Sequence, residues 1–176
     1  MSSELEIDDA VFGYAKSYSK LWKIIQDNPS EFPSNAISCG SIAEHYAKKY
    51  LEFIHEGATV RFGTANEKAW DIEVVTIDSQ TYKYQVKSVS LFNRSRTTTQ
   101  LVKGFDRLIV LSLDCDFFPY HAYLFEDAVA FWASNKIKKL MIPDPSSRRK
   151  TGTPVFQSAK DIRDEFFDAL ALEGNT

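Results

Sequence analysis

One acid, one amide and one lysine are spaced in the sequence so that a β-hairpin would bring them onto one face. They are Asp71, Gln85 and Lys87. The surrounding segments, residues 70–77 and 81–90, alternate polar and apolar side chains with the period of two that is typical of strands. A carboxylate, an amide oxygen and an ammonium group in one small patch can hold a hard divalent cation beside a phosphate group.

The short polar segment between the two strands decides which residues lie opposite one another. We expect residues 78–80 to form a three-residue loop. Glu73 then lies opposite Gln85. Asp71 lies opposite Lys87, with Cβ atoms roughly 5 Å apart. The apolar side chains of both strands are expected on the other face, directed into a core: Trp70, Ile72, Val74, Tyr84 and Val86.

Glu44 supplies a second carboxylate from a segment that is predicted to be helical. From Ser38 or Ser41 to about Ile54, apolar side chains recur at helical spacing after a serine that can cap the helix. Glu44 lies at the edge of this apolar stripe, so a helix packed on the sheet would present its carboxylate beside Asp71. The alternative is a surface glutamate that makes a local ion pair.

The rest of the pattern predicts an α/β fold with a central mixed sheet flanked by helices. Residues 107–113 form a continuous apolar run, which is typical of a buried strand that pairs in parallel with a neighbour. The other predicted elements are helices at 4–27, 97–104, 127–132 and 158–172, and strands at 58–62 and 120–125.

Composition is that of a globular protein. The chain has 176 residues, 44% of them hydrophobic, which is enough for a single domain spanning residues 1–176. It contains no apolar stretch long enough to span a membrane, and its acidic N-terminus is unlike a signal peptide. With two distant cysteines as well, we expect a cytoplasmic protein. The net charge is −3, but basic residues concentrate in two segments, 83–107 and 136–150.

The acid, amide, lysine and preceding glutamate together resemble the PD-(D/E)XK nuclease superfamily. The matching residues are Gly40-Ser41-Ile42-Ala43-Glu44 in the helix, Asp71 in the second strand and Gln85-Val86-Lys87 in the third. The resemblance covers about residues 38–126. It implies a restriction-endonuclease-like sandwich, with residues 1–37 as a helical N-terminal segment and 127–176 as C-terminal helices. Gln85 stands where the family usually has a carboxylate, which leaves open an inactive domain.

The resemblance also implies an activity, a metal and roles for the residues. Glu44, Asp71, Gln85 and Lys87 would form the catalytic site. Mg²⁺, or Mn²⁺ as a substitute, would be held by Asp71, Gln85, the Val86 carbonyl and Glu44. Lys87 would orient or deprotonate the attacking water, or pair with the phosphate. The expected activity is metal-dependent hydrolysis of DNA phosphodiester bonds.

Double-stranded DNA is therefore the expected partner. Two loops could contact it: one holds Asn93, Arg94 and Arg96, and the other holds Arg148, Arg149 and Lys150. The sharpest interpretation is a type II restriction endonuclease that acts as a homodimer, with a cognate methyltransferase acting on the same site. The alternatives are a repair or junction-resolving nuclease of the same fold, or an inactive nucleic-acid-binding module.

Overall fold

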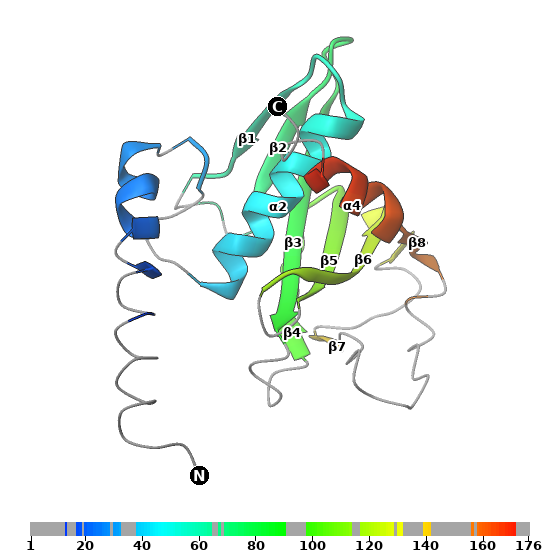
Figure 1. Ribbon diagram of the computed structural model, residues 1–176. Coiled ribbons are helices and arrows are strands. Elements are labelled where there is room, and N and C mark those ends of the chain that lie inside the picture. Colours follow the sequence, from blue (N-terminus) through cyan, green and yellow to red (C-terminus); the bar gives the residue numbers. More distant parts are fainter. Residues whose placement is uncertain are drawn as a thin grey trace.

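The sheet is the centre of the molecule and is built from both halves of the chain. The computed structural model describes residues 13, 17–18, 20–28, 30–32, 38–64, 67, 69–90, 98–113, 117–128, 130–131, 139–141, 156 and 158–171. The elements are α2 (Cys39–Ile54), β1 (Thr59–Phe62), β2 (Ile72–Val75), β3 (Thr81–Ser90), β4 (Thr98–Gln100), β5 (Arg107–Leu113), β6 (Pro119–Phe125), β7 (Lys139–Met141), β8 (Lys160–Asp161) and α4 (Arg163–Ala171). They are labelled in Figure 1, where α2 and α4 cross the sheet side by side.

The main sheet has six strands in the order β1-β2-β3-β5-β6-β8. β3 and β5 pair in parallel, and the other neighbours pair antiparallel. β5 lies between β3 and β6 and is buried from Leu108 to Leu113, so the predicted buried, parallel strand is confirmed. The α/β class with a central mixed sheet is confirmed as well.

Two apolar clusters cover the two faces of this sheet. On one face α2 and α4 pack on the strands, and Ala43, Ala47, Leu51 and Phe166 meet side chains such as Ile109. The other face carries Trp70, Val89, Phe105, Val110 and Phe131, among others. Trp70 was expected to share a face with Ile72, but it lies in the second cluster because it precedes the regular part of β2.

α2 begins with a capping box. The Ser38 hydroxyl accepts a hydrogen bond from the Ser41 backbone N–H at 3.1 Å, and the Ser38 N–H donates to the Ser41 hydroxyl at 2.8 Å. Both bonds satisfy groups that a helix end leaves without a partner. Of the two predicted caps, Ser38 is thus the N-cap, and Ser41 completes the box from inside the helix. This fixes where the first turn of α2 starts.

The hairpin between β2 and β3 has a different register from the predicted one. Val75 pairs with Thr81, and Glu73 pairs with Lys83. The loop is longer than expected because Thr76 closes it: its N–H donates to the Gln80 carbonyl at 2.9 Å, and its carbonyl accepts from the Ser79 N–H at 2.9 Å. The pairing of Glu73 with Gln85 and of Asp71 with Lys87 was therefore wrong. The shift is by two residues, so the side chains of the paired residues keep their predicted faces.

Several smaller predictions are corrected or confirmed. The helix expected at 97–104 is wrong, because β4 pairs with β7 as a two-stranded sheet. The last helix starts later than predicted, since β8 precedes it. The first helix is confirmed at its C-terminal end, which is helical up to Asp27. The helix predicted from Asp127 is also confirmed, since Ala128, Ala130 and Phe131 are helical.

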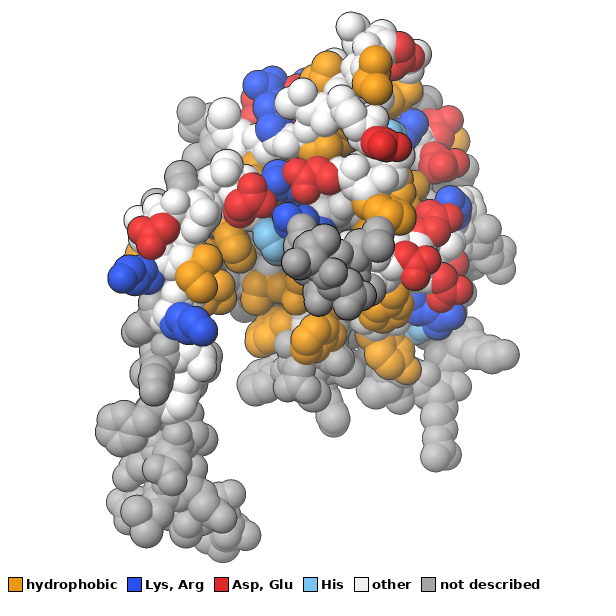
Figure 2. Space-filling view, turned by 45° about the horizontal axis from the view of Figure 1, so that its top comes forward, with side chains coloured by type: hydrophobic (Ala, Val, Ile, Leu, Met, Phe, Trp, Pro, Cys, Tyr) orange, Lys and Arg blue, Asp and Glu red, His pale blue; other side chains and the backbone are white. Residues whose placement is uncertain are grey.

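Charges on the face viewed in Figure 2 are mixed, with acidic and basic side chains close together. Many of them pair. Lys48 contacts Glu31 at 3.3 Å and Glu52 at 2.7 Å, and Lys160 contacts Glu165 at 2.8 Å. A surface of alternating sign is a poor match for the uniform negative charge of a phosphate backbone.

Candidate active site

The site begins where β2 separates from β3. The pairing between these strands runs as far as Ile72 opposite Tyr84, whereas β3 continues to Ser90. Asp71 lies at the fork, which is the point beyond Ile72 where β2 leaves β3. Its N–H donates to the Tyr84 carbonyl at 2.8 Å, and its Oδ2 accepts from the Val86 N–H at 2.7 Å. The Asp71 side chain therefore replaces a backbone partner and is fixed against β3.

The first turns of α2 approach the same part of β3. The Ser88 hydroxyl donates to the Cys39 carbonyl at 3.4 Å and lies 3.5 Å from the Cys39 Sγ. The Glu44 side chain turns back along the helix, since its Oε1 lies about one contact distance, 4.0 Å, from where a Cβ on Gly40 would be. The Glu44 carboxylate therefore lies over the first turn of α2, the part of the helix that contacts β3 through Cys39 and Ser88.

Electrostatics link Glu44 to the two charged groups on the strands. Burial raises the pKa of Glu44 to about 7, the negative charge of Asp71 adds to this, and the Lys87 ammonium opposes it. Burial also raises the pKa of Asp71, against the Val86 hydrogen bond and the charge of Lys87. The structure thus brings together three of the four predicted catalytic side chains: Glu44, Asp71 and Lys87. Two carboxylates held this way favour a cation between them.

Gln85 is the fourth predicted residue, and it is completely buried. Its Nε2 donates to the Ala69 carbonyl at 3.0 Å. Because that carbonyl can only accept, the bond fixes which end of the amide carries the oxygen. The Gln85 Oε1 is buried and has no hydrogen-bond partner among the described residues. A buried amide oxygen without a donor is an uncommon arrangement, and a cation would satisfy it.

The donor set therefore fits a hard divalent cation. Glu44, Asp71 and Gln85 all offer oxygen, which Mg²⁺ and Mn²⁺ prefer over nitrogen or sulfur. Within the described ranges, no three His, Cys, Asp or Glu side chains are grouped to hold a metal. Among the described residues, a third protein ligand would then be an amide or backbone oxygen, and the Val86 carbonyl stays a prediction for that role.

Glu73 takes no part in this group. Its carboxylate is bound by Arg61, whose Nε lies 2.7 Å from Oε2 and whose Nη2 makes a second contact. Glu73 is nearly buried, at 8% exposed, and lies opposite Lys83. Glu73 was expected opposite Gln85, but the observed register pairs it with Lys83, and its carboxylate is occupied by Arg61.

Two residues that support Gln85 escaped the sequence reasoning. Ala69 contributes its backbone carbonyl. Every residue has this group, so the residue type does not indicate the role. Gly104 has a positive φ of 122°, and a Cβ there would lie 2.8 Å from the Ala69 Cβ. Gly104 is thus the residue type that allows the 101–105 segment to approach Ala69. In the sequence, only a glycine between Lys103 and Phe105 marks this approach.

The predicted DNA-contacting residues lie outside the described residues. This applies to Asn93, Arg94 and Arg96 in one loop, and to Arg148, Arg149 and Lys150 in the other. Their roles stay predictions. What the structure adds is the position of the strands between the loops, because β4 follows the first loop and pairs with β7, which precedes the second.

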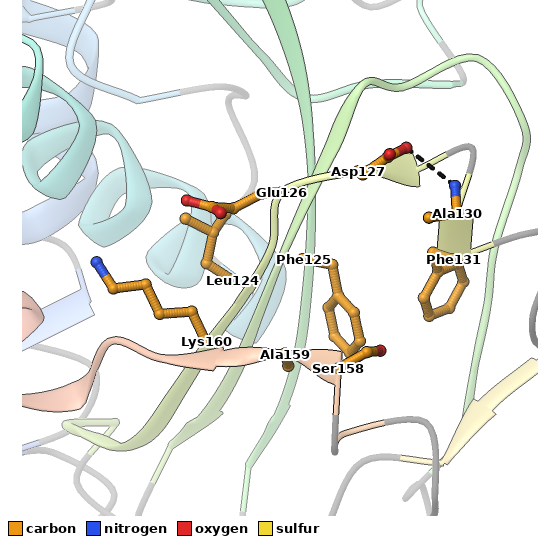
Figure 3. A pocket seen from close by; sticks show the side chains of 9 residues that line it. All are labelled: Leu124, Phe125, Glu126, Asp127, Ala130, Phe131, Ser158, Ala159 and Lys160. Atoms are coloured by element: carbon orange, nitrogen blue, oxygen red, sulfur yellow. Dashed lines mark hydrogen bonds between the residues drawn. The ribbon is translucent and has the colours of Figure 1, made fainter.

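A cavity of about 330 Å³ lies elsewhere, where the end of β6 and the start of β8 meet. Figure 3 shows its lining, with Phe125 at the centre and the Glu126 and Lys160 side chains to one side. Its one dashed bond runs from the Ala130 N–H to the Asp127 carboxylate, at 2.9 Å. Asp127 thus caps the helical turn that follows it.

Comparisons with known proteins find similar chains among solved structures. No family model matches the chain, and no curated protein matches it. Among solved structures, the bacterial homing endonuclease I-Ssp6803I is similar, with 14% identity and a TM-score of 0.42. The match covers 78% of this chain and 95% of that one. None of the helices in the described part of the chain is long and apolar enough to cross a membrane.

Proposed function

We propose that this protein is a metal-dependent endonuclease that hydrolyses phosphodiester bonds in double-stranded DNA. One observation carries the proposal: Glu44, Asp71 and Lys87 converge at the fork of β2 and β3, beside the unpartnered oxygen of Gln85. Phosphodiester hydrolysis needs a bound cation, an activated water and a positive charge near the phosphate, and this set of side chains suits all three.

Each residue has a role that follows from its position. Asp71, fixed by the Val86 N–H, and Glu44, directed from α2, would hold Mg²⁺ or Mn²⁺ with the Gln85 oxygen. When bound, the cation lowers the pKa of a coordinated water and neutralises charge on the scissile phosphate. Lys87 orients that water or pairs with a phosphate oxygen. The hydrogen bond to Ala69 keeps the Gln85 oxygen on the side of the site.

The finer assignment is a type II restriction endonuclease. One such site cuts one strand, so cutting both strands of a palindrome requires two copies related by a two-fold axis. A methyltransferase that modifies the same sequence would then be the cognate partner. A repair or junction-resolving nuclease would share the site but lack sequence-specific cleavage.

The absence of a third carboxylate favours a second candidate, an inactive nuclease-like module that binds nucleic acid. Gln85 removes one negative charge from the place where the resembled family usually has an acid. Such a module would bind DNA without cleaving it. Cleavage and binding therefore have to be measured on the same protein.

The experiment compares wild type with Lys87→Ala on supercoiled plasmid in Mg²⁺, with binding measured in parallel in Ca²⁺. We expect Lys87→Ala to lose at least about a hundredfold in cleavage rate, because a positioned charge in the transition state contributes this much. DNA affinity should change little. Lys160→Ala, at the opposite edge of the sheet, is the matched control and should cleave as wild type does. Equal cleavage by wild type and Lys87→Ala would remove Lys87 from the mechanism.

A further inference from the structure

The short segment 69–71 serves two ligands of the proposed metal site. Asp71 brings its own carboxylate, which accepts a hydrogen bond from the Val86 N–H at 2.7 Å. Ala69 brings its carbonyl, which accepts from the Gln85 Nε2 at 3.0 Å. The position of this segment therefore decides where both the Asp71 carboxylate and the Gln85 amide lie.

Gly104 lies against the first residue of the segment. Its φ of 122° is in the region that favours glycine, because a Cβ makes that conformation strained. A Cβ at this position would also lie 2.8 Å from the Ala69 Cβ, which is closer than two carbon atoms can pack. Since the Ala69 Cβ is fixed to its backbone, a side chain at position 104 would force the segment to move.

Gly63 lies against the second residue of the segment. A Cβ on Gly63 would lie 3.0 Å from the Trp70 ring and 3.2 Å from the Trp70 carbonyl. The Gly63 N–H also donates to the Asp71 carbonyl at 2.8 Å. Trp70 is buried in the second apolar cluster, and the Lys83 Nζ lies 5.3 Å from its ring centroid. Trp70 therefore has no room to shift away from a side chain at position 63.

The Ala69 carbonyl suits an amide at position 85. A carbonyl can only accept a hydrogen bond, and the Gln85 Nε2 supplies the donor. A carboxylate in the same place would bring two acceptors together without a proton between them. The amide leaves its oxygen on the other branch of the side chain, where it is buried without a partner among the described residues.

We infer that Gly63 and Gly104 are positioning residues, which hold segment 69–71 so that the Gln85 amide presents its oxygen, and not its nitrogen, to the cation. The two glycines and segment 69–71 are called the glycine clamp below. The inference rests on the metal site of the proposed function. It extends that site to residues that offer no ligand themselves. Residues that orient a metal ligand typically change metal affinity by roughly 10–100-fold when they are replaced.

Calorimetric titration of the full chain with Mg²⁺ tests the clamp. Gly104→Ala should weaken Mg²⁺ binding by roughly 10–100-fold. Gly57→Ala is the matched control, because Gly57 also has a positive φ, of 75°, and a Cβ there would lie 2.9 Å from the Ile77 Cδ1. Ile77 is 78% exposed, so its side chain can turn away. Both variants should unfold at lower urea concentrations than wild type, but Gly57→Ala should keep the Mg²⁺ affinity of wild type.

A double-mutant cycle tests whether Gly104 acts through Gln85. Gln85→Ala removes the amide, so adding Gly104→Ala to it should cause no further loss of Mg²⁺ affinity. Gly63→Ala is the second variant of the clamp and lacks the strained φ, so it serves if Gly104→Ala does not fold. Its effect on Mg²⁺ affinity should likewise vanish in the Gln85→Ala background.

Hydrogen exchange of the Gln85 side-chain amide, followed by NMR, gives a readout without metal. In wild type and in Gly57→Ala, the Nε2 protons should be protected, because the side chain is buried and bonded to Ala69. In Gly104→Ala they should exchange at least about tenfold faster, since the displaced carbonyl no longer holds them. Gln85→Ala assigns the signal by its loss.

The outcomes separate the clamp from the nuclease. Unchanged Mg²⁺ affinity in Gly104→Ala and Gly63→Ala, an equal loss in Gly57→Ala, or a full further loss in the Gln85→Ala background would each overturn the inference and leave the nuclease proposal intact. Unprotected Gln85 amide protons in wild type would do the same. Mg²⁺ affinities that follow the prediction, without cleavage of DNA, would overturn the nuclease proposal and leave the clamp. A wild type that binds no Mg²⁺ would overturn both.

Discussion

Glu44 is the residue that makes the site sensitive to pH. Its pKa is about 7 in the folded chain, against an ordinary value of 4.5, mainly because it is buried and also because Asp71 is near. Between these two values the folded chain binds more protons than the unfolded chain. The free energy of unfolding therefore falls as pH rises from about 4.5 to about 7 and is level above that.

Glu44→Gln should remove this dependence. At pH 8 and without metal, the variant should be more stable than wild type by up to about 3 kcal/mol, because a shift of one pKa unit corresponds to about 1.4 kcal/mol. At pH 4 the difference should vanish. Urea unfolding at a series of pH values measures it, with the exposed Glu56→Gln as the control for loss of a negative charge. Parallel curves for Glu44→Gln and wild type would show that Glu44 is not destabilised by its surroundings.

Gln85 offers a test of the metal at the residue scale. Gln85→Glu puts a third acid into a completely buried position beside Asp71. In chelator it should lose about 2 kcal/mol or more of stability, because a buried charge without a partner is costly. Saturating Mg²⁺ should stabilise it more than it stabilises wild type, since a ligand at a hundred times its Kd contributes about 2.7 kcal/mol and tighter binding contributes more. Equal Mg²⁺ effects on unfolding, in wild type and variant, would make Gln85 a bystander.

At the scale of elements, the capping box of α2 sets the position of Glu44. Ser38→Ala removes the acceptor for the Ser41 N–H and should cost about 1 kcal/mol of stability. Because Glu44 lies near the end of the helix that frays, Mg²⁺ affinity should fall as well. Calorimetric titration with Mg²⁺ and urea unfolding measure the two effects, and Ser30→Ala, in an exposed turn, is the control. If Ser38→Ala loses stability but keeps its Mg²⁺ affinity, the capping box does not set the position of Glu44.

The hairpin shows what a pattern of alternation can and cannot predict. Alternation predicted the right faces for the paired residues, because a face depends only on whether positions are odd or even. It failed for Trp70, which precedes the regular part of β2. It did not predict the register, which depends on the bonds that close the loop at Thr76 and Gln80. The fork at Asp71 was not predictable either. Hydrophobic periodicity does not show where a side chain takes the place of a backbone hydrogen-bond partner.

At the scale of the whole molecule, the place of an element in the fold was predictable where a strand or a helical face is fully buried. The apolar run of β5 identified the central parallel strand, and the stripe of α2 identified the helix on the sheet. Short elements were less predictable. β4 and β8 have three and two residues and are held by partners distant in the chain, so local sequence carries little of the information. The approach of Glu44 to Asp71 was predictable from the position of Glu44 at the edge of the α2 stripe, and the resemblance to a known family supplied the expected roles of the two residues.

The most direct test of the central claim is cleavage of supercoiled and phage DNA by wild type and Asp71→Asn under defined metal conditions. Asp71→Asn keeps the shape of the side chain and an oxygen for the Val86 N–H, while it removes the charge that holds a cation. We predict cleavage by wild type in Mg²⁺ or Mn²⁺, none in excess chelator, binding without cleavage in Ca²⁺, and no cleavage by Asp71→Asn. Cleavage that persists in chelator, or equal cleavage by Asp71→Asn, would contradict a metal site at the fork of β2 and β3.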